Sequence, residues 1–204
     1  MFFNKSPKFE EIVSNNPIKG KDKKYFVTLQ LKDGNDIMCQ FGSKLMVKNQ
    51  LEKESSSMEV IFNNQELKDF IQECDDHVLS MCKLNKGEWF PGENEISDTY
   101  LENAIMSSLK QQKKSENVSL KVRTSNKMII FDSSKQEIEN SEIQENSKVS
   151  LIVQMAGIWF TKTRFGITWK IKQIKLHNDK PQTQGEYLFE DVDDDELDNV
   201  FPDD

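Results

Sequence analysis

Two long β-strand candidates in direct succession constrain the fold of this chain more than any other feature. They span residues 148–163 and 165–177 and turn near residues 164–166. The first is apolar on both faces as far as Gly157, so it is predicted to lie in the interior of a sheet. Because the connecting turn is short, the two strands are expected to pair in an antiparallel sheet.

Shorter strand candidates precede this pair. Alternating patterns predict strands at residues 25–32, 36–41, 58–62, 118–124 and 127–131. The tight turns Asp33–Gly34 and Ser125–Asn126 predict that the first two of these strands form one hairpin and the last two form another. Residues 1–24 mix polar residues with prolines and are predicted to form a flexible N-terminal arm.

Between residues 63 and 112 the apolar period changes to that of helices. Asn63 is predicted to cap a first helix, and Ser97 precedes a second. The adjacent carboxylates Asp75 and Asp76 point about 100° apart on a helix and are interpreted as a solvated face rather than a metal site. The first apolar stripe comprises Leu67, Phe70, Ile71, Cys74, Val78, Met81 and Cys82, and the second comprises Leu101, Ala104, Ile105 and Leu109.

This order of elements predicts a mainly β protein with a helical insertion, of the α+β class. A small antiparallel barrel of the oligonucleotide-binding (OB) type over residues 25–177, with the insertion at residues 63–112, fits the series best. A split α+β sandwich is the alternative architecture. Residues 178–204 are predicted to be a linker and a disordered acidic tail.

The net charge of −8 conceals an uneven distribution along the chain. Residues 186–204 hold 10 acidic residues and no Lys or Arg, which leaves 27 basic and 25 acidic residues in the rest. The basic residues concentrate at residues 110–127 and 148–180. A polyanionic partner, which the overall charge would disfavour, is therefore compatible with the body of the chain.

Several functional classes leave no trace in the sequence. The 3 cysteines show no paired spacing, and the first residues lack the apolar core of a signal peptide, so a reducing compartment is predicted. Neither histidine has zinc-ligand neighbours, and phosphate-binding glycine loops and nucleophile elbows are missing. The longest apolar run, Leu151–Phe160, is about half the ~20 residues of a membrane span. We therefore expect no metal, no cofactor, no catalytic residues and no membrane partner.

Aromatic and basic residues alternate in the second half of the long strand pair. Binding of single-stranded nucleic acid needs cations that follow phosphates and rings on which unpaired bases stack. Ideal alternation places Phe160 with the cations and Trp169 on the opposite face beside Ile167 and Ile171, which favours a core position for Trp169. Whether Trp159 and Trp169 stack on bases or lie in the core is left open. The candidate DNA-binding residues are Phe160, Lys162, Arg164, Phe165, Trp169, Lys170, Lys172 and Lys175, with Lys121 and Arg123 from an earlier strand.

These cations also have simpler interpretations. Lysines on an exposed sheet face protect edge strands against aggregation, and lysines in a last helical turn, such as Lys110, offset the helix dipole. The acidic tail retains apolar residues, of which Phe189, Leu197 and Phe201 are candidates for docking to a partner. A tethered polyanion also competes with DNA for a cationic groove at high effective concentration.

The segment IWFTKTRFGITWKIKQIK at residues 158–175, together with an acidic tail that bears Phe201, resembles the phage-type acidic-tailed single-stranded DNA-binding proteins. The chain looks most like the branch of this family found in large eukaryotic DNA viruses. The resemblance implies an OB barrel, coating of single strands in viral DNA replication and recombination, and a tail that contacts polymerase or helicase-primase. It also implies an intracellular location, in the host nucleus or at a cytoplasmic viral replication site.

Two functions of different classes follow from these patterns. The first is a sequence-nonspecific binder of single-stranded DNA without catalytic activity. The alternative is a protein-interaction or assembly factor whose acidic tail holds a basic protein partner. A homodimer is compatible with both, and the preference for DNA over RNA is left open.

Overall fold

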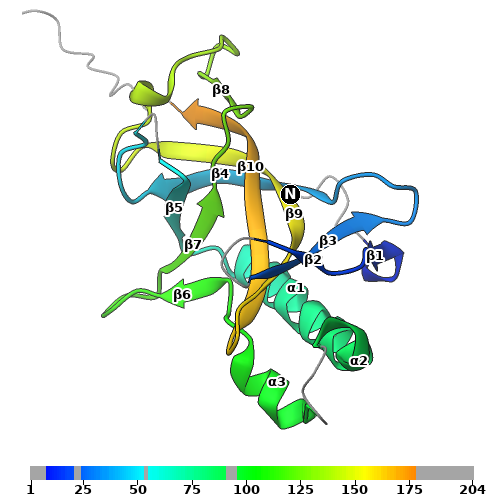
Figure 1. Ribbon diagram of the computed structural model, residues 1–204. Coiled ribbons are helices and arrows are strands. Elements are labelled where there is room, and N and C mark those ends of the chain that lie inside the picture. The colour runs from blue at the N-terminus through cyan, green and yellow to red at the C-terminus, as the bar shows by residue number, and fades with distance from the viewer. Residues whose placement is uncertain (1–7, 21–23, 53–54, 91–95, 178–204) are drawn as a thin grey trace, which may run out of the picture.

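A computed structural model describes residues 8–20, 24–52, 55–90 and 96–177 (Figure 1). The predicted linker and acidic tail, including Phe189, Leu197 and Phe201, lie outside the described residues. Among the described residues, no helix combines the length and the apolar composition needed to cross a membrane.

Five strands close into a barrel. β9 pairs with β4, β4 with β5, β5 with β7, β7 with β10, and β10 again with β9. Every pairing in this ring is antiparallel except β7–β10, which is parallel and consists of the single residue pair Lys170 and Arg123. This ring is the OB barrel that the sequence predicts. Its members are β4 (Met38–Val47), β5 (Ser57–Phe62), β7 (Val118–Arg123), β9 (Lys148–Phe160) and β10 (Phe165–His177).

The predicted pairing of the two longest strands is confirmed. β9 and β10 form an antiparallel ladder from Phe160 opposite Phe165 to Lys148 opposite His177. The inward face of this ladder supplies a large part of the core, because its apolar side chains are almost completely buried. Trp169 lies in the core as predicted, with its ring centroid 5.7 Å from that of Phe41 on β4.

A β-bulge at Gly157 changes which side chains of β9 face inward. Gly157 lies opposite Thr168, whereas Met155 lies opposite the next residue, Trp169, so β9 contains one extra residue at this point. Alternation is therefore reversed beyond the bulge, and Ile158 and Phe160 are buried. The prediction of an exposed Phe160 is wrong for this reason, and Trp159 takes the outward position.

The two predicted short hairpins do not form. β3 (Tyr25–Leu31) and β4 pair one after the other with the same edge of β9, so β3 does not pair with β4. β8 (Ile129–Phe131) pairs in parallel with β10 rather than with β7. The tight turns at Asp33–Gly34 and Ser125–Asn126 are present. The strands that flank them pair with the longer strands β9 and β10, which offer more backbone hydrogen-bonding groups than the short neighbouring strands do.

Part of the predicted N-terminal arm is bound to the body. A 3₁₀ helix (Phe9–Glu11) leads into β1 (Ile12–Ser14), and β2 (Ile18–Lys19) follows. Both β1 and β2 pair antiparallel with β3. Ile12 is buried in the core, so this segment adds to the sheet.

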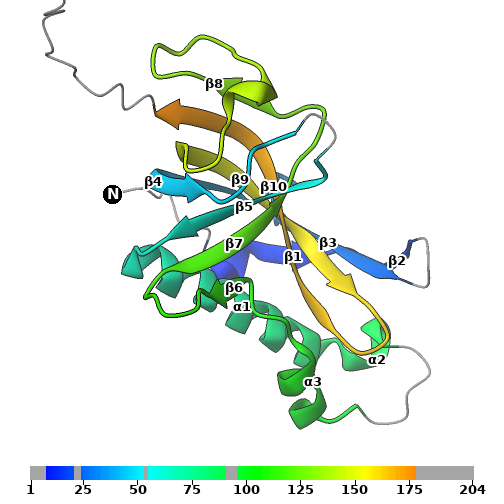
Figure 2. The ribbon, with the colours of Figure 1, turned by 90° about the vertical axis from the view of Figure 1, so that its left-hand side faces the viewer.

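The helical insertion covers one end of the barrel, as Figures 1 and 2 show. α1 (Gln65–Leu84) buries the complete predicted apolar stripe, although its cap is Asn64, whose side chain accepts a hydrogen bond of 2.7 Å from Leu67 N. α2 (Lys86–Trp89) and α3 (Asp98–Ala104) follow, and Ser97 caps α3 as predicted. A further 3₁₀ helix (Asn140–Glu142) precedes β9.

The predicted second helix ends earlier than expected. Helix α3 stops at Ala104, and Leu109 begins a strand, β6 (Leu109–Gln111), that pairs with β7. Lys110 therefore lies in a strand, and the helix-dipole interpretation of this lysine is wrong.

We expect Gly157→Ala to destabilise the fold. A Cβ at residue 157 would lie 2.2 Å from the carbonyl oxygen of Val27 and 2.6 Å from the ring of Phe26. Relief of this overlap would require β3 to move away from β9, so the free energy of unfolding should fall by about 1–3 kcal/mol or more. Urea unfolding measures this change.

Gly87→Ala is the matched control. Residue 87 lies in α2 and has open space where a Cβ would be, so this variant should be neutral or slightly more stable. Equal effects of the two substitutions would contradict the assigned role of Gly157.

Candidate nucleic-acid interface

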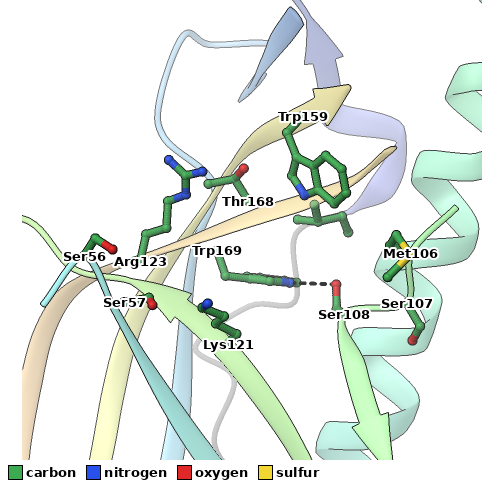
Figure 3. A pocket seen from close by; sticks show the side chains of 11 residues that line it. Ser56, Ser57, Met106, Ser107, Ser108, Lys121, Arg123, Trp159, Thr168 and Trp169 are labelled. Atoms are coloured by element: carbon green, nitrogen blue, oxygen red, sulfur yellow. Dashed lines mark hydrogen bonds between the residues drawn. The ribbon is translucent and has the colours of Figure 1, made fainter. Parts of the chain in front are cut away.

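The edge of β10 between Phe165 and Lys170 has no strand paired to it in the described part of the chain. Met106 N donates a 2.7 Å hydrogen bond to Phe165 O, and the next pairing on this edge is that of Lys170 with Arg123. Between these two points lies a cavity of about 470 Å³, here called the seam pocket (Figure 3). It is lined by Ser56, Ser57, Met106, Ser107, Ser108, Lys121, Arg123, Trp159, Ile167, Thr168 and Trp169.

The seam pocket carries positive charge on its β7 wall. Lys121 and Arg123 are exposed, two residues apart on β7, and neither forms an ion pair with a described residue. Glu59 lies opposite Lys121 on β5 but is bound instead by Lys48, with 2.9 Å between Nζ and Oε1. Burial opposes ionisation of Glu59, but hydrogen bonds from Ser119 and Lys48 and the charge of Lys48 outweigh it and hold the pKa low. Both cations therefore stay available to an anion.

Trp159 supplies an aromatic surface at the opposite wall. Its side chain is half-buried and projects into the seam pocket from the outward face of β9. The indole packs over Gly166 on the paired strand, where an added Cβ would lie 3.1 Å from Trp159 Cζ2. A glycine at this position thus lets the ring lie close against the sheet.

A buried hydrogen-bond chain fixes the floor of the seam pocket. Trp169 Nε1 donates to Ser108 Oγ over 3.0 Å, and Ser108 Oγ donates to Asp75 Oδ1 over 2.7 Å. Asp75 also accepts from Ser108 N at 2.8 Å and from Ser107 Oγ at 3.2 Å. The chain connects α1 through the segment before β6 to β10.

Asp75 is therefore not part of a solvated face, and that prediction is wrong. Its side chain is buried between α1 and residues 107–108, whereas Asp76 is exposed. Burial raises the pKa of Asp75, and the hydrogen bonds from Ser108 and Ser107 only partly offset this effect. The carboxylate orders the pocket wall at a cost in desolvation.

One polar atom at the seam pocket has no partner. Thr168 Oγ1 is buried without a hydrogen-bond partner among the described residues, and Thr168 lines the pocket opposite Gly157. Buried polar groups in folded proteins are almost always satisfied. The hydroxyl of Thr168 therefore has unused hydrogen-bonding capacity at the wall of the seam pocket.

Other predicted site residues lie away from the seam pocket. Phe160 and Phe165 stack on each other with centroids 5.8 Å apart and are buried beside Trp89 and Phe90, so neither ring is available for base stacking. Phe160 ends β9 and Phe165 begins β10, so the two rings flank the turn between these strands. The prediction that Phe160 is a stacking surface is therefore wrong.

The β9–β10 turn, which carries Lys162 and Arg164, is hydrogen-bonded to α3. Lys162 is exposed, and its carbonyl accepts a hydrogen bond of 3.4 Å from Tyr100 Oη. Arg164 Nη1 donates to Asn103 O over 2.6 Å. The turn is thereby held against the helical insertion rather than projecting freely.

The three lysines of β10 have different surroundings. Lys170 lies across from Arg123 at the seam. Lys172 forms an ion pair of 3.1 Å with Asp36, and Lys175 lines a second cavity beside β8. The structure thus brings Lys121, Arg123, Trp169 and Lys170 together and separates the others from them.

The sequence leaves the role of Trp159 open and does not point to the serines of the pocket. The signal for Trp159 was Gly157, because a glycine inside a strand often marks a bulge that reverses alternation. Ser107 and Ser108 carried no signal, since their role depends on a buried carboxylate more than 30 residues earlier in the chain.

The described residues that line the seam pocket include no cysteine. Cys39, Cys74 and Cys82 are free and buried, and the core positions of Cys74 and Cys82 are those that the sequence predicts. Burial raises the pKa of Cys39 to about 12 and raises those of Cys74 and Cys82 further, which disfavours the reactive thiolates. Among the described residues, no three His, Cys, Asp or Glu side chains gather closely enough to hold a metal ion.

Comparison with protein families gives one match. The model of a family of unknown function, DUF5871, matches residues 48–191, which is more than half of the chain. The chain belongs to this family. The DUF5871 match begins in the connection between β4 and β5 and includes all residues of the seam pocket. No protein with a curated function matches the sequence.

Solved structures with similar backbones include single-stranded DNA-binding proteins of bacteriophages. The gp2.5 single-stranded DNA-binding protein of bacteriophage T7 has a TM-score of 0.47 at 8% identity, over 69% of this chain and 91% of its own. The single-stranded DNA-binding protein of bacteriophage Enc34 has a TM-score of 0.48 at 14% identity, over 86% and 94%. Its complex with single-stranded DNA has a TM-score of 0.43 at 13% identity, over 82% and 95%. All three TM-scores lie below 0.5, so function must be argued from the residues of this chain.

The raised pKa of Asp75 predicts a pH-dependent contribution to stability. A folded-state pKa above the ordinary value of 3.8 means that the native state binds the proton more tightly than the unfolded state does. As pH rises from 3.8 through the raised pKa of Asp75, the free energy of unfolding of the wild type should therefore fall relative to that of Asp75→Asn. Urea unfolding of both proteins between acidic and neutral pH measures the difference.

The control is Asp76→Asn, which removes the same charge from the exposed neighbour. A difference between wild type and Asp75→Asn that stays constant with pH would contradict a raised pKa for Asp75.

Proposed function

We propose that this protein binds single-stranded DNA without sequence preference and has no catalytic role. The observation that carries the proposal is the seam pocket, where two unpaired cations and an outward-facing indole line one cavity on an OB barrel. Phosphates would contact Lys121 and Arg123, and an unpaired base would stack on Trp159.

The position of the seam pocket in the barrel supports this function. In OB folds the second and third strands and the adjoining loops contact oligonucleotides. Here β5 and β7 occupy those two positions in the ring, and Ser57, Lys121 and Arg123 point outward from them. The pocket thus lies where an OB barrel offers its binding surface.

The shape of the seam pocket favours a single strand over a duplex. Trp159 lies over the sheet within a cavity, so a base reaches it only when it is free of its own partner. The hydroxyls of Ser56 and Ser57, which line the pocket, can form hydrogen bonds with any base, and this is compatible with binding that ignores sequence.

A role in viral DNA replication and recombination extends this proposal. Its support is the sequence pattern of residues 158–175 and the acidic composition of residues 186–204. Within the tail, Phe189, Leu197 and Phe201 would dock to replication proteins, and the carboxylates would compete with DNA for the cations of the body.

Neutralising the seam cations should weaken DNA binding. In Lys121→Gln/Arg123→Gln, two phosphate contacts are lost, and the slope of log affinity against log salt should decrease by about 1.4. Affinity for oligo-dT should fall roughly 10- to 30-fold at moderate salt for the same reason. Fluorescence anisotropy over a salt series measures both quantities.

Lys8→Gln/Lys32→Gln is the matched control, because it removes the same charge from exposed positions near Glu11, away from the pocket. Its affinity should remain that of the wild type. Equal losses in both variants, or no binding of oligo-dT by the wild type at low salt, would reject the proposed function.

A further inference from the structure

A second cavity lies over the outer face of β10, next to the edge along which the seam pocket lies. β7 and β8 both pair in parallel with this edge, β7 at Lys170 and β8 at Gln173–Lys175. Beyond β8, a cavity of about 490 Å³, here called the β8 groove, lies between β8, β10, β9 and β4. Figures 1 and 2 show β8 alongside the C-terminal end of β10.

The chemistry of the β8 groove matches that of a nucleic-acid subsite. Lys135 and Lys175 are exposed on its walls, and neither forms an ion pair with a described residue. Phe131 and Ile152 contribute half-buried apolar side chains to the groove. Among the described residues that line the groove, the one carboxylate is that of Asp132, which accepts a hydrogen bond of 2.8 Å from Gln136 N.

The amide groups of the groove add hydrogen-bonding capacity. Gln40 from β4 and Gln173 from β10 line the cavity and are exposed, and neither side chain has a hydrogen-bond partner among the described residues. An amide offers both a donor and an acceptor, so it can bind the edge of any base.

We propose that the β8 groove is a second subsite for single-stranded DNA, which continues from the seam pocket along the outer surface of β10. The inference rests on the proposed function. Lys170 and Lys175 are five residues apart, which is roughly 17 Å at about 3.3 Å per strand residue. Single OB folds cover about 4–16 nucleotides, more than the bases beside Trp159 alone, so one strand can reach both cavities.

Charge along this path is confined to its two ends. Lys172, between the cavities, is neutralised by Asp36 at 3.1 Å. The lysines of β10 that remain available are therefore Lys170 at the seam and Lys175 in the groove. This separation lets each cavity be weakened without altering the other.

Oligonucleotide length distinguishes the two subsites. Binding of labelled oligo-dT of about 4 and about 16 nucleotides, the limits of the range for one OB fold, is measured for three variants of equal charge. These are the groove variant Lys135→Gln/Lys175→Gln, the seam variant Lys121→Gln/Arg123→Gln, and the control Lys8→Gln/Lys32→Gln.

The groove variant should lose roughly 10-fold or more in affinity for the longer oligonucleotide, with a salt slope smaller by about 1.4, and should bind the shorter one as the wild type does. The seam variant should weaken both. If the groove variant bound the longer oligonucleotide as the wild type does, the proposal would be overturned. The groove would then bind something other than DNA, such as acidic residues 186–204.

Equal weakening of both lengths by the groove variant would also overturn it, because the effect would then be a general one of charge. These outcomes are distinct from failure of the proposed function itself, in which the wild type would bind neither oligonucleotide.

Discussion

The antiparallel ladder between β9 and β10 is the interaction on which the other elements depend. Of the other three barrel strands, β4 pairs with β9 and β7 pairs with β10, and only β5 pairs with neither. The β7–β10 contact is the single pair Lys170 and Arg123, which closes the ring. Within the ladder, the bulge at Gly157 decides which aromatic residues enter the core. Phe160 therefore packs in the core against Phe165 and Trp89, and Trp159 lies at the surface.

The open seam follows from the way β10 is paired. Its outer edge is shared among the segment before β6, then β7, then β8, and none of these covers residues 166–169 in the described part of the chain. The gap is stabilised by the buried chain from Asp75 through Ser108 to Trp169. A helix that does not touch the proposed ligand thus fixes the wall of its pocket.

Much of this fold can be predicted from the residues, because patterns of burial are local. The apolar stripe of α1 and the two long strands were found in this way, and closure into an OB barrel followed from their order. Pairing partners are not local: Asp33–Gly34 makes the expected turn, yet β3 and β4 each pair with β9.

The candidate site was predicted only in part for the same reason. Lys121, Arg123 and Lys170 were identified by charge and come together at the seam. Strict alternation along β9 predicts that Phe160, rather than Trp159, is the exposed aromatic residue. The single extra residue at Gly157 reverses the faces of the strand, so this prediction is wrong. The burial of Asp75 depends on a tertiary contact with Ser107 and Ser108 that its own helix does not reveal.

Fluorescence of single tryptophans tests the central claim most directly. The chain has 3 tryptophans, so a variant with Trp89→Phe and Trp169→Phe reports on Trp159 alone, and one with Trp89→Phe and Trp159→Phe reports on Trp169. Titration with oligo-dT should strongly quench Trp159, because a base stacks on its exposed face, and should change the buried Trp169 much less. Saturable binding with no change in Trp159 emission would contradict the placement of single-stranded DNA at the seam between β7 and β10.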